Sequence, residues 1–239
     1  MAKALSTAAP RTLESGTPGS PTLAETAFTQ LKKQIISGQL APGRPLRLEA
    51  LKGSLGIGFT PLREALTRLT SEGLVEINGQ RGFRVAPVTL QKLEDTIQRR
   101  IEIEALALTR ALERGNEDWE AKIIANFHRL SRRKAIDPET GLISPAWDSA
   151  HHGFHFSIVE GCDSEWLLYF WQLLFDQSHR YRQIAVTHGM PYRDDHVEHQ
   201  KMVDALLDRD LDKALAASRS HIESTYKVVL KVLPDITRS

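Results

Sequence analysis

The chain has few cysteines, no long apolar run and no large excess of charge. Its one cysteine among 239 residues, Cys162, excludes an internal disulfide and favours a reducing compartment, the cytoplasm. No stretch approaches the ~20 apolar residues that a membrane helix needs, so we expect no membrane partner. The formal net charge is +1, so any strongly charged surface must be local.

The first twenty residues also lack an apolar run, which excludes a secretory signal there. They are rich in alanine, serine, threonine, glycine and proline. We therefore expect residues 1–21 to form a disordered lead before the folded part of the chain.

The strongest local pattern begins at Thr60. This residue can cap a helix N-terminus, and Pro61 suits the first helical position, where no N–H is needed. Gly73 is placed to end the helix. Between them an apolar stripe has the spacing i, i+3, i+4, i+7 and consists of Leu62, Ala65, Leu66 and Leu69. The opposite face carries hydroxyl and basic side chains, namely Thr60, Arg63 and Thr67.

A hairpin follows this helix directly. Residues 74–77 and 83–85 predict two short strands, joined through Asn78-Gly79. Arg81 lies in the tip of the hairpin. A helix with a basic outer face, followed by a glycine-tipped hairpin, is typical of a winged helix-turn-helix that reads DNA.

The upstream residues complete this unit. Thr22 and Glu25 have capping-box spacing at the start of a helix that should run to about Gly38. Residues 48–55 predict a second short helix before the turn into the third. We therefore predict a DNA-binding domain over residues 22–88.

This segment is basic although the whole chain is nearly neutral. It has nine lysines and arginines against five acidic residues, a surplus that suits a phosphate backbone. We expect Arg63 to reach a base, and Lys32 and Arg81 to meet phosphates. The predicted DNA contacts are Lys32, Arg47, Thr60, Arg63, Thr67 and Arg81. The alternative is an ordinary solvated surface on a small helical domain.

After Pro87 no further strand pattern appears. Thr89 can cap the next helix, so the linker should be short. We predict an all-α second domain over residues 89–233, which makes the fold mainly α, with a bundle of six to seven helices. The expected helices cover residues 90–114, 118–135, 145–161, 164–187, 191–207 and 210–233.

Four histidines in this second half have a suggestive spacing. His151 and His155 are four residues apart, so they share one face of a helix. If the last two helices pack antiparallel, His199 near the start of one can face His221 near the end of the other. Four converging imidazoles would bind a divalent metal such as Zn²⁺ or Ni²⁺. The alternative for any one of them is an ordinary buried or exposed histidine.

These features together resemble the GntR family of transcriptional regulators, in the FadR type with an FCD effector domain. The resemblance covers residues 23–230. It rests on Thr60-Pro-Leu-Arg-Glu-Ala-Leu66, the Arg81-Gly-Phe-Arg-Val85 wing, Arg100 four residues before Glu104, Phe154-His155, and Glu198-His199 with His221. It implies a homodimer that binds operator DNA.

The resemblance also implies a metal site. Many FCD domains hold a metal with one aspartate and three histidines, which match His155, His199 and His221 here. The aspartate position holds His151 instead. Either His151 is the fourth ligand, which its spacing favours, or Asp148 one turn earlier reaches in.

Two further residues matter for recognition. Arg100 matches the arginine that binds small carboxylate effectors in similar proteins, although it could also be a surface cation paired with Glu104. Phe59 stands where relatives usually have an arginine that contacts DNA. It could touch a thymine methyl or pack in the turn. The motifs look nearest to the CsiR-like branch, whose members act on glutarate and 4-aminobutyrate catabolism.

We therefore predict a repressor that a small carboxylate, such as a five-carbon dicarboxylate, releases from its operator. One alternative is a regulator that senses the metal itself. Another is a metal-dependent enzyme on a helical scaffold, for which Glu160 and Glu198 are the carboxylates that could act as a base. Because neither glutamate lies in a catalytic motif, we predict that the protein is not an enzyme.

Overall fold

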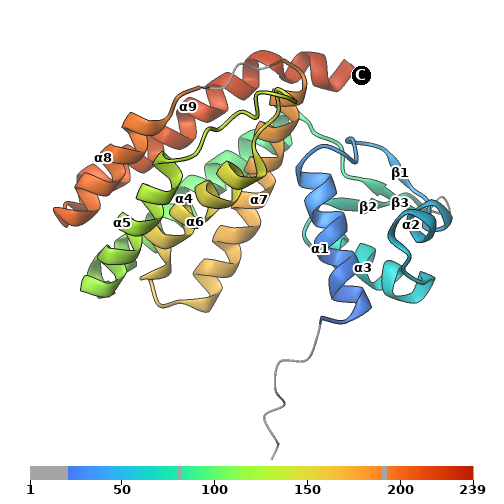
Figure 1. Ribbon diagram of the computed structural model, residues 1–239, viewed down its shortest axis with the longest axis horizontal. Helices are drawn as coiled ribbons and strands as arrows, with labels where there is room; N and C mark the ends of the chain where they lie inside the picture. Colours follow the sequence, from blue (N-terminus) through green and yellow to red (C-terminus); the bar gives the residue numbers. More distant parts are fainter. Residues whose placement is uncertain (1–20, 80–81, 190–192, 239) are drawn as a thin grey trace, which may run out of the picture.

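The computed structural model describes residues 21–79, 82–189 and 193–238. The chain forms two lobes, an N-terminal one with a small sheet and a larger one that is entirely helical (Figure 1). Each lobe has its own cluster of buried apolar side chains. The fold is mainly α, as predicted. None of the described helices is long and apolar enough to cross a membrane.

The N-terminal lobe is a winged helix-turn-helix. Its elements are α1 (Leu23–Ile36), β1 (Pro45–Leu46), α2 (Leu48–Leu55), α3 (Phe59–Ser71), β2 (Val75–Ile77) and β3 (Phe83–Val85). The sheet is antiparallel in the order β1-β3-β2. Strand β1, which pairs Leu46 with Phe83, was not predicted. The expected lead, residues 1–21, lies almost wholly outside the described residues, and so does Arg81 in the wing.

The capping predictions for α1 and α3 have different outcomes. The capping box of α1 is present, because Thr22 N donates to Glu25 Oε2 at 2.7 Å and Glu25 N donates to Thr22 Oγ1 at 3.2 Å. The prediction that Thr60 caps α3 is wrong. Gly58 is the N-cap residue, and its carbonyl accepts the first helical hydrogen bond, so Thr60 and Pro61 lie inside the first turn.

The helical lobe contains α4 (Leu90–Arg114), α5 (Glu117–Ser131), α6 (Pro145–Glu160), α7 (Glu165–Thr187), α8 (His196–Leu207) and α9 (Leu211–Arg238). Three predicted bounds are wrong. Helix α5 ends at Ser131 rather than at residue 135, with Arg132 as its C-cap residue, and a turn in which Asp137 Oδ1 accepts two backbone N–H groups follows. Helix α8 begins at His196 rather than at residue 191, and α9 continues past Leu233.

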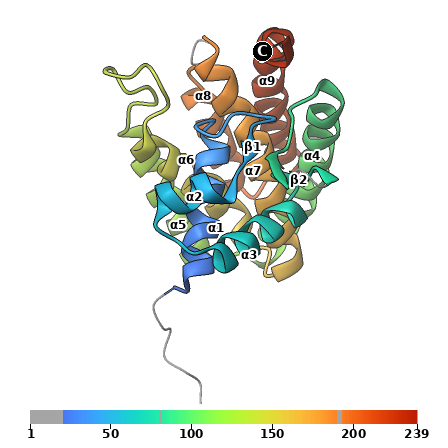
Figure 2. The same ribbon diagram turned by 90° about the vertical axis from the view of Figure 1, so that its right-hand side faces the viewer.

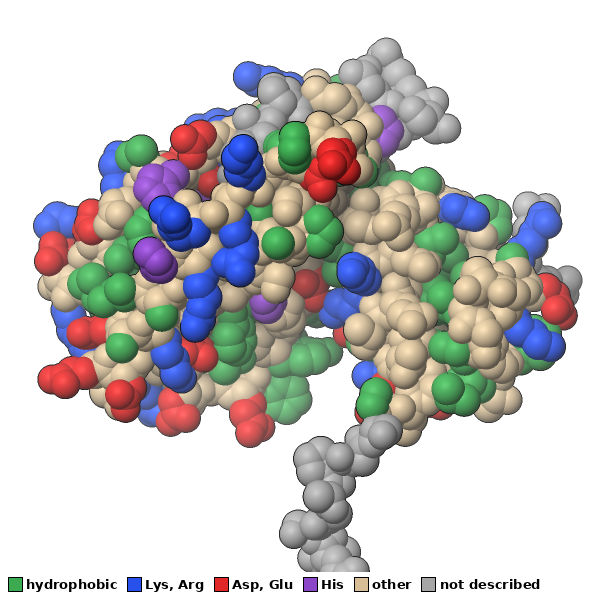
Figure 3. All heavy atoms as spheres, in the orientation of Figure 1, with side chains coloured by type: hydrophobic (Ala, Val, Ile, Leu, Met, Phe, Trp, Pro, Cys, Tyr) green, Lys and Arg blue, Asp and Glu red, His purple; other side chains and the backbone are tan. Residues whose placement is uncertain are grey.

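Helix α7 is the part of the helical lobe that faces the N-terminal lobe. It packs against α4 within its own lobe and against α1 of the other (Figures 1 and 2). The chain crosses between lobes in a short segment, where Thr89 caps α4 and Arg180 of α7 donates to the carbonyl of Ala86. Beside this contact, residues of α1, α6 and α7 line an open cleft of about 600 Å³ between the lobes (Figure 3).

Candidate metal centre and DNA-binding face

The four predicted histidines converge in the middle of the helical lobe. His151 and His155 come from α6, His199 from α8 and His221 from α9, and each is at most 3% exposed. One nitrogen from each ring lies within 4.8 Å of the others. Helices α8 and α9 pack together so that the His199 and His221 rings are 4.7 Å apart between centroids. This is the juxtaposition that the sequence predicted.

Burial favours the neutral form of His151, His155 and His199. Burial and the nearby Arg182 guanidinium hold the pKa of His151 well below its usual value, and burial and His221 do the same for His155. The pKa of His199 falls to about 2 for the same reasons, burial and then His221. Neutral imidazole is the form that ligates a metal.

Two carboxylates lie behind the histidine rings. His221 Nδ1 donates to Glu198 Oε2 at 2.9 Å, which leaves the other nitrogen of His221 for the cluster. Glu198 also accepts from Arg193. Although burial raises the pKa of Glu198, the hydrogen bonds from His221 and Arg193 bring it below its usual value. The second carboxylate is that of Asp195, whose Oδ1 lies 3.6 Å from His199 Nδ1.

The donor set fits a divalent ion. Among the described residues, the buried Nε2 of His199 and the buried Nδ1 of His155 have no hydrogen-bond partner, which is costly unless something binds there. Asp148, the alternative fourth ligand, lies outside the cluster, and its Oδ1 is 2.8 Å from His179 Nε2. The geometry therefore favours His151 as the fourth ligand.

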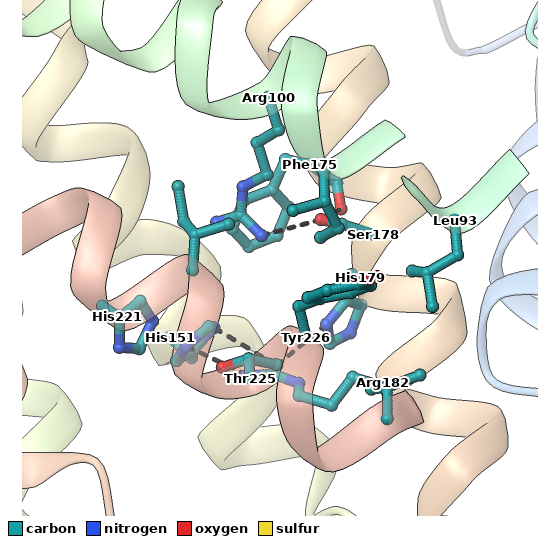
Figure 4. A pocket seen from close by; sticks show the side chains of 13 residues that line it. Leu93, Arg100, His151, Phe175, Ser178, His179, Arg182, His221, Thr225 and Tyr226 are labelled. Carbon is teal, nitrogen blue, oxygen red and sulfur yellow. Dashed lines mark hydrogen bonds between the residues drawn. The ribbon is translucent and has the colours of Figure 1, made fainter. Parts of the chain in front are cut away.

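A small pocket with both polar and apolar lining adjoins the cluster between α4, α7 and α9. Figure 4 shows His151 and His221 on one side of it and Arg100 on the other. Arg100 is 8% exposed, so it is not a surface cation. Its Nη1 donates to Ser178 Oγ at 2.7 Å and its Nε lies 3.5 Å from Glu104 Oε2. The cavity holds only about 20 Å³, room for one or two waters.

A second guanidinium in this pocket was not predicted. Arg182 of α7 is 7% exposed, and its two terminal nitrogens lie 3.1 and 3.4 Å from the ring nitrogens of His151. It also lies 2.8 Å from His179 Nδ1. The sequence gives one weak indication that Arg182 faces the pocket. The i, i+3, i+4, i+7 pattern of one helix face is followed by Phe175, Ser178, His179 and Arg182.

The proposed DNA-reading face lies on the outside of α3. Thr60, Arg63 and Thr67 are exposed there, and Thr67 Oγ1 donates to the carbonyl of Arg63 at 2.9 Å. Arg47 is exposed at the start of α2. Phe59 is 38% exposed with the Lys52 ammonium 4.6 Å from its ring centroid, so it does not fill the turn.

Lys32 does not belong to this face. Its ammonium lies 2.8 Å from Glu72 Oε2 and 2.8 Å from Asp176 Oδ2, between the two lobes. Its side chain is 20% exposed. The placement argues against the predicted phosphate contact, because two carboxylates already neutralise this lysine. Sequence reasoning missed this because the partner Asp176 lies on α7, far along the chain.

Comparisons with known proteins agree with this architecture. Residues 23–85 match the bacterial regulatory proteins of the gntR family, and residues 95–224 match the FCD domain. The HTH-type transcriptional repressor GlaR of Escherichia coli is 36% identical over 210 residues, which cover 86% of this chain and 95% of that protein. The uncharacterized HTH-type transcriptional regulator BphR of Paraburkholderia xenovorans is 35% identical over 210 residues, 87% of this chain and 85% of its own.

A solved structure has the same fold. Escherichia coli McbR/YncC superimposes with a TM-score of 0.72 at 20% sequence identity, covering 89% of this chain and 99% of that one. At this identity the likeness concerns the fold alone. It extends over both lobes, because little of either chain is left out.

Proposed function

Because the chain belongs to the GntR family of transcriptional regulators and carries an FCD domain, we propose that it is a repressor released from its operator by a small carboxylate bound beside a metal ion. One observation carries the effector part of this proposal. Two buried guanidiniums, those of Arg100 and Arg182, line one cavity together with His151 and His221 of the histidine cluster. Such a site concentrates positive charge away from water, which is the environment that an anion with two charged ends would occupy.

Each residue has a distinct part in this site. His151, His155, His199 and His221 would hold Zn²⁺ or Ni²⁺, which supplies a Lewis acid for one carboxylate end. Arg100 would bind the other end, since its buried Nη2 has no hydrogen-bond partner among the described residues. A five-carbon dicarboxylate such as glutarate has two carboxylates, one for the metal ion and one for Arg100. It cannot enter the cavity of about 20 Å³ unless Arg100 or Arg182 moves.

The effector proposal is tested by calorimetry and gel shift with a panel of carboxylates that includes glutarate. We expect glutarate to bind the wild type and to weaken operator binding, and Arg100→Ala to abolish both effects. The matched control is Arg99→Ala, because Arg99 is an exposed neighbour paired with Glu102 at 2.7 Å. Failure of every carboxylate to bind below millimolar concentration, or binding that leaves operator affinity unchanged, would exclude this control mechanism.

The proposed mode of DNA binding involves two copies of the chain. We propose a homodimer that places its two α3 helices in adjacent major grooves of a short inverted repeat. An exposed aromatic cluster at the start of α7 supports a second copy as partner. Trp166 is 74% exposed, Tyr169 51% and Phe170 41%, and their rings contact one another. Sedimentation should give a dimer, and Trp166→Ser with Phe170→Ser should shift it toward monomer.

A metal-sensing regulator is the second candidate. Four histidine ligands are enough to close a tetrahedral shell, and closed four-ligand sites commonly serve structure rather than ligand exchange. In that case the ion itself would set operator affinity. Gel shifts with metal-free and metal-loaded protein, without any carboxylate, separate the two candidates, because the metal sensor must change its operator affinity on metal binding alone.

A further inference from the structure

Helix α7 contacts both functional parts of the molecule through different faces. Phe175, Ser178 and Arg182 line the pocket beside the histidines (Figure 4). Asp176 and Gln177, the next residues along, contact the DNA-binding lobe instead. Helix α7 therefore contacts both the proposed effector pocket and the DNA-binding lobe within the same few turns.

Lys32 lies in the contact between α7 and the DNA-binding lobe. It lies on α1, and its ammonium joins Glu72, which follows α3 directly, to Asp176 of α7. Gln177 Nε2 donates to the carbonyl of Glu72 at 2.6 Å. Asp176 is 11% exposed at its side chain and Glu72 18%. One cation thus joins the first helix, the C-terminal end of the recognition helix and the effector-facing helix.

The charges at this point depend on one another. Although burial lowers the pKa of Lys32, the carboxylates of Asp176 and Glu72 raise it above its usual value, so the ammonium stays charged. Without Lys32 the two carboxylates would face each other with no cation between them. With Lys32 in place, they draw α3 toward α7.

The pocket side of α7 is held by bonds that a ligand must break. Arg100 donates to Ser178, Arg182 Nη1 lies 3.1 Å from His151 Nε2, and the cavity between the two arginines is nearly filled. A carboxylate that binds Arg100 competes with Ser178. Residues 176 and 178 are two apart on one helix, so a shift of α7 at Ser178 also moves the carboxylate of Asp176.

We propose that Lys32, held between Glu72 and Asp176, is a positioning residue that fixes the orientation of α3 relative to α7 and transmits movement of α7 to the DNA-binding lobe. The transmission part rests on the proposed function, whereas the orientation part does not. Lys32 therefore acts on DNA recognition through α3 and does not touch DNA.

The orientation is tested by the distance between the lobes. Spin labels are placed on cysteines that replace the exposed Glu49 of α2 and Asp212 of α9, in chains diluted with unlabelled protein. The native Cys162 is buried. We expect one narrow distance distribution for the wild type and a broad or shifted one for Asp176→Asn. The control Asp163→Asn removes an ion pair with Arg114 inside the helical lobe and should change nothing.

Exchanging the charges of Lys32 and Asp176 distinguishes a positioning role from a general effect on folding. Lys32→Glu places a third carboxylate at the junction and should broaden the distribution further. Lys32→Glu combined with Asp176→Lys restores one cation between two carboxylates and should narrow it again. Identical distributions in the wild type, in Asp176→Asn and in Lys32→Glu would overturn the proposal, and so would a double variant no narrower than Lys32→Glu.

Transmission is tested with glutarate as the probe. In the wild type we expect glutarate to weaken operator binding about 5–150-fold, the usual range of such coupling. In Asp176→Asn glutarate should still bind with wild-type affinity but change operator affinity less than twofold. A wild-type response in Asp176→Asn would overturn the transmission role. If glutarate does not bind the wild type, the proposed effector is wrong, and the distance measurements still decide the role of Lys32.

Discussion

The two lobes differ in what they bury. The core of the N-terminal lobe is apolar, built from leucines, isoleucines, valines and alanines of α1 to β3. The helical lobe also has an apolar core, but every buried polar or charged side chain within residues 21–79, 82–189 and 193–238 belongs to it. Those side chains include the four histidines, Arg100 and Arg182.

This difference separates two ways of carrying function. A winged helix-turn-helix reads DNA with exposed side chains, so its interior only has to be stable. A lobe that binds a small ion and a small anion must place polar groups inside, where each one costs free energy unless it is paired. Substitutions of charged residues should therefore affect stability in the helical lobe and binding in the N-terminal lobe.

The largest effect is expected from the buried carboxylate of Glu104. It accepts from Ser218 Oγ at 2.7 Å and pairs with Arg100. Glu104→Ala leaves a buried guanidinium without its carboxylate, and should lower the free energy of unfolding by about 3–5 kcal/mol in chemical denaturation. Glu102 on the same helix, whose side chain is 43% exposed, is the control, for which Glu102→Ala should cost about 0–1 kcal/mol. Equal losses would contradict the contrast between buried and exposed charge.

The second effect concerns the carboxylate behind the proposed metal ligands. Glu198→Gln keeps the size of the side chain but weakens the acceptor that holds His221 Nδ1. We expect zinc affinity, measured by competition with a chromogenic chelator, to fall about 10–100-fold. Glu223→Gln, which breaks a pair with Arg219 on the same helix α9, should leave zinc affinity unchanged. A wild-type affinity in Glu198→Gln would show that this carboxylate does not orient a ligand.

The third effect belongs to the surface of the N-terminal lobe. Arg63→Ala should weaken operator binding by about 1–3 kcal/mol at matched salt if the guanidinium contacts a base, and should leave thermal stability near the wild-type value. Arg133→Ala removes the same charge from the helical lobe and should not change operator affinity. Unchanged operator binding in Arg63→Ala would mean that α3 is not the reading face.

The sequence predicted the elements that depend on local pattern. The α1 capping box, the stripe of α3 and the i, i+4 pair His151 and His155 all follow from spacing alone. The meeting of His199 and His221 needed one further assumption, antiparallel packing of α8 and α9. Strand β1 was missed because two residues are too few to show an alternating pattern.

The missed site residues share a physical cause. From Ser178 to Val186 every residue of α7 is buried, so no polar face indicates which side chains point to the pocket and which to the other lobe. Arg180 and Arg182 look alike in the sequence, but one bonds the interlobe segment and the other His151. The basic character of the N-terminal domain predicts a DNA contact for Lys32. Nothing in the local sequence indicates that its ion-pair partner lies in the other domain.

The central claim is that the buried histidines of the helical lobe hold a divalent ion. The most direct measurement is elemental analysis with X-ray absorption spectroscopy on protein purified without chelator. We predict close to one zinc or nickel ion per chain, with a shell of imidazole nitrogens at about 2.0–2.1 Å, lost in His199→Ala. A protein that carries no metal, and gains neither bound ion nor thermal stability when Zn²⁺ or Ni²⁺ is added, would contradict the account.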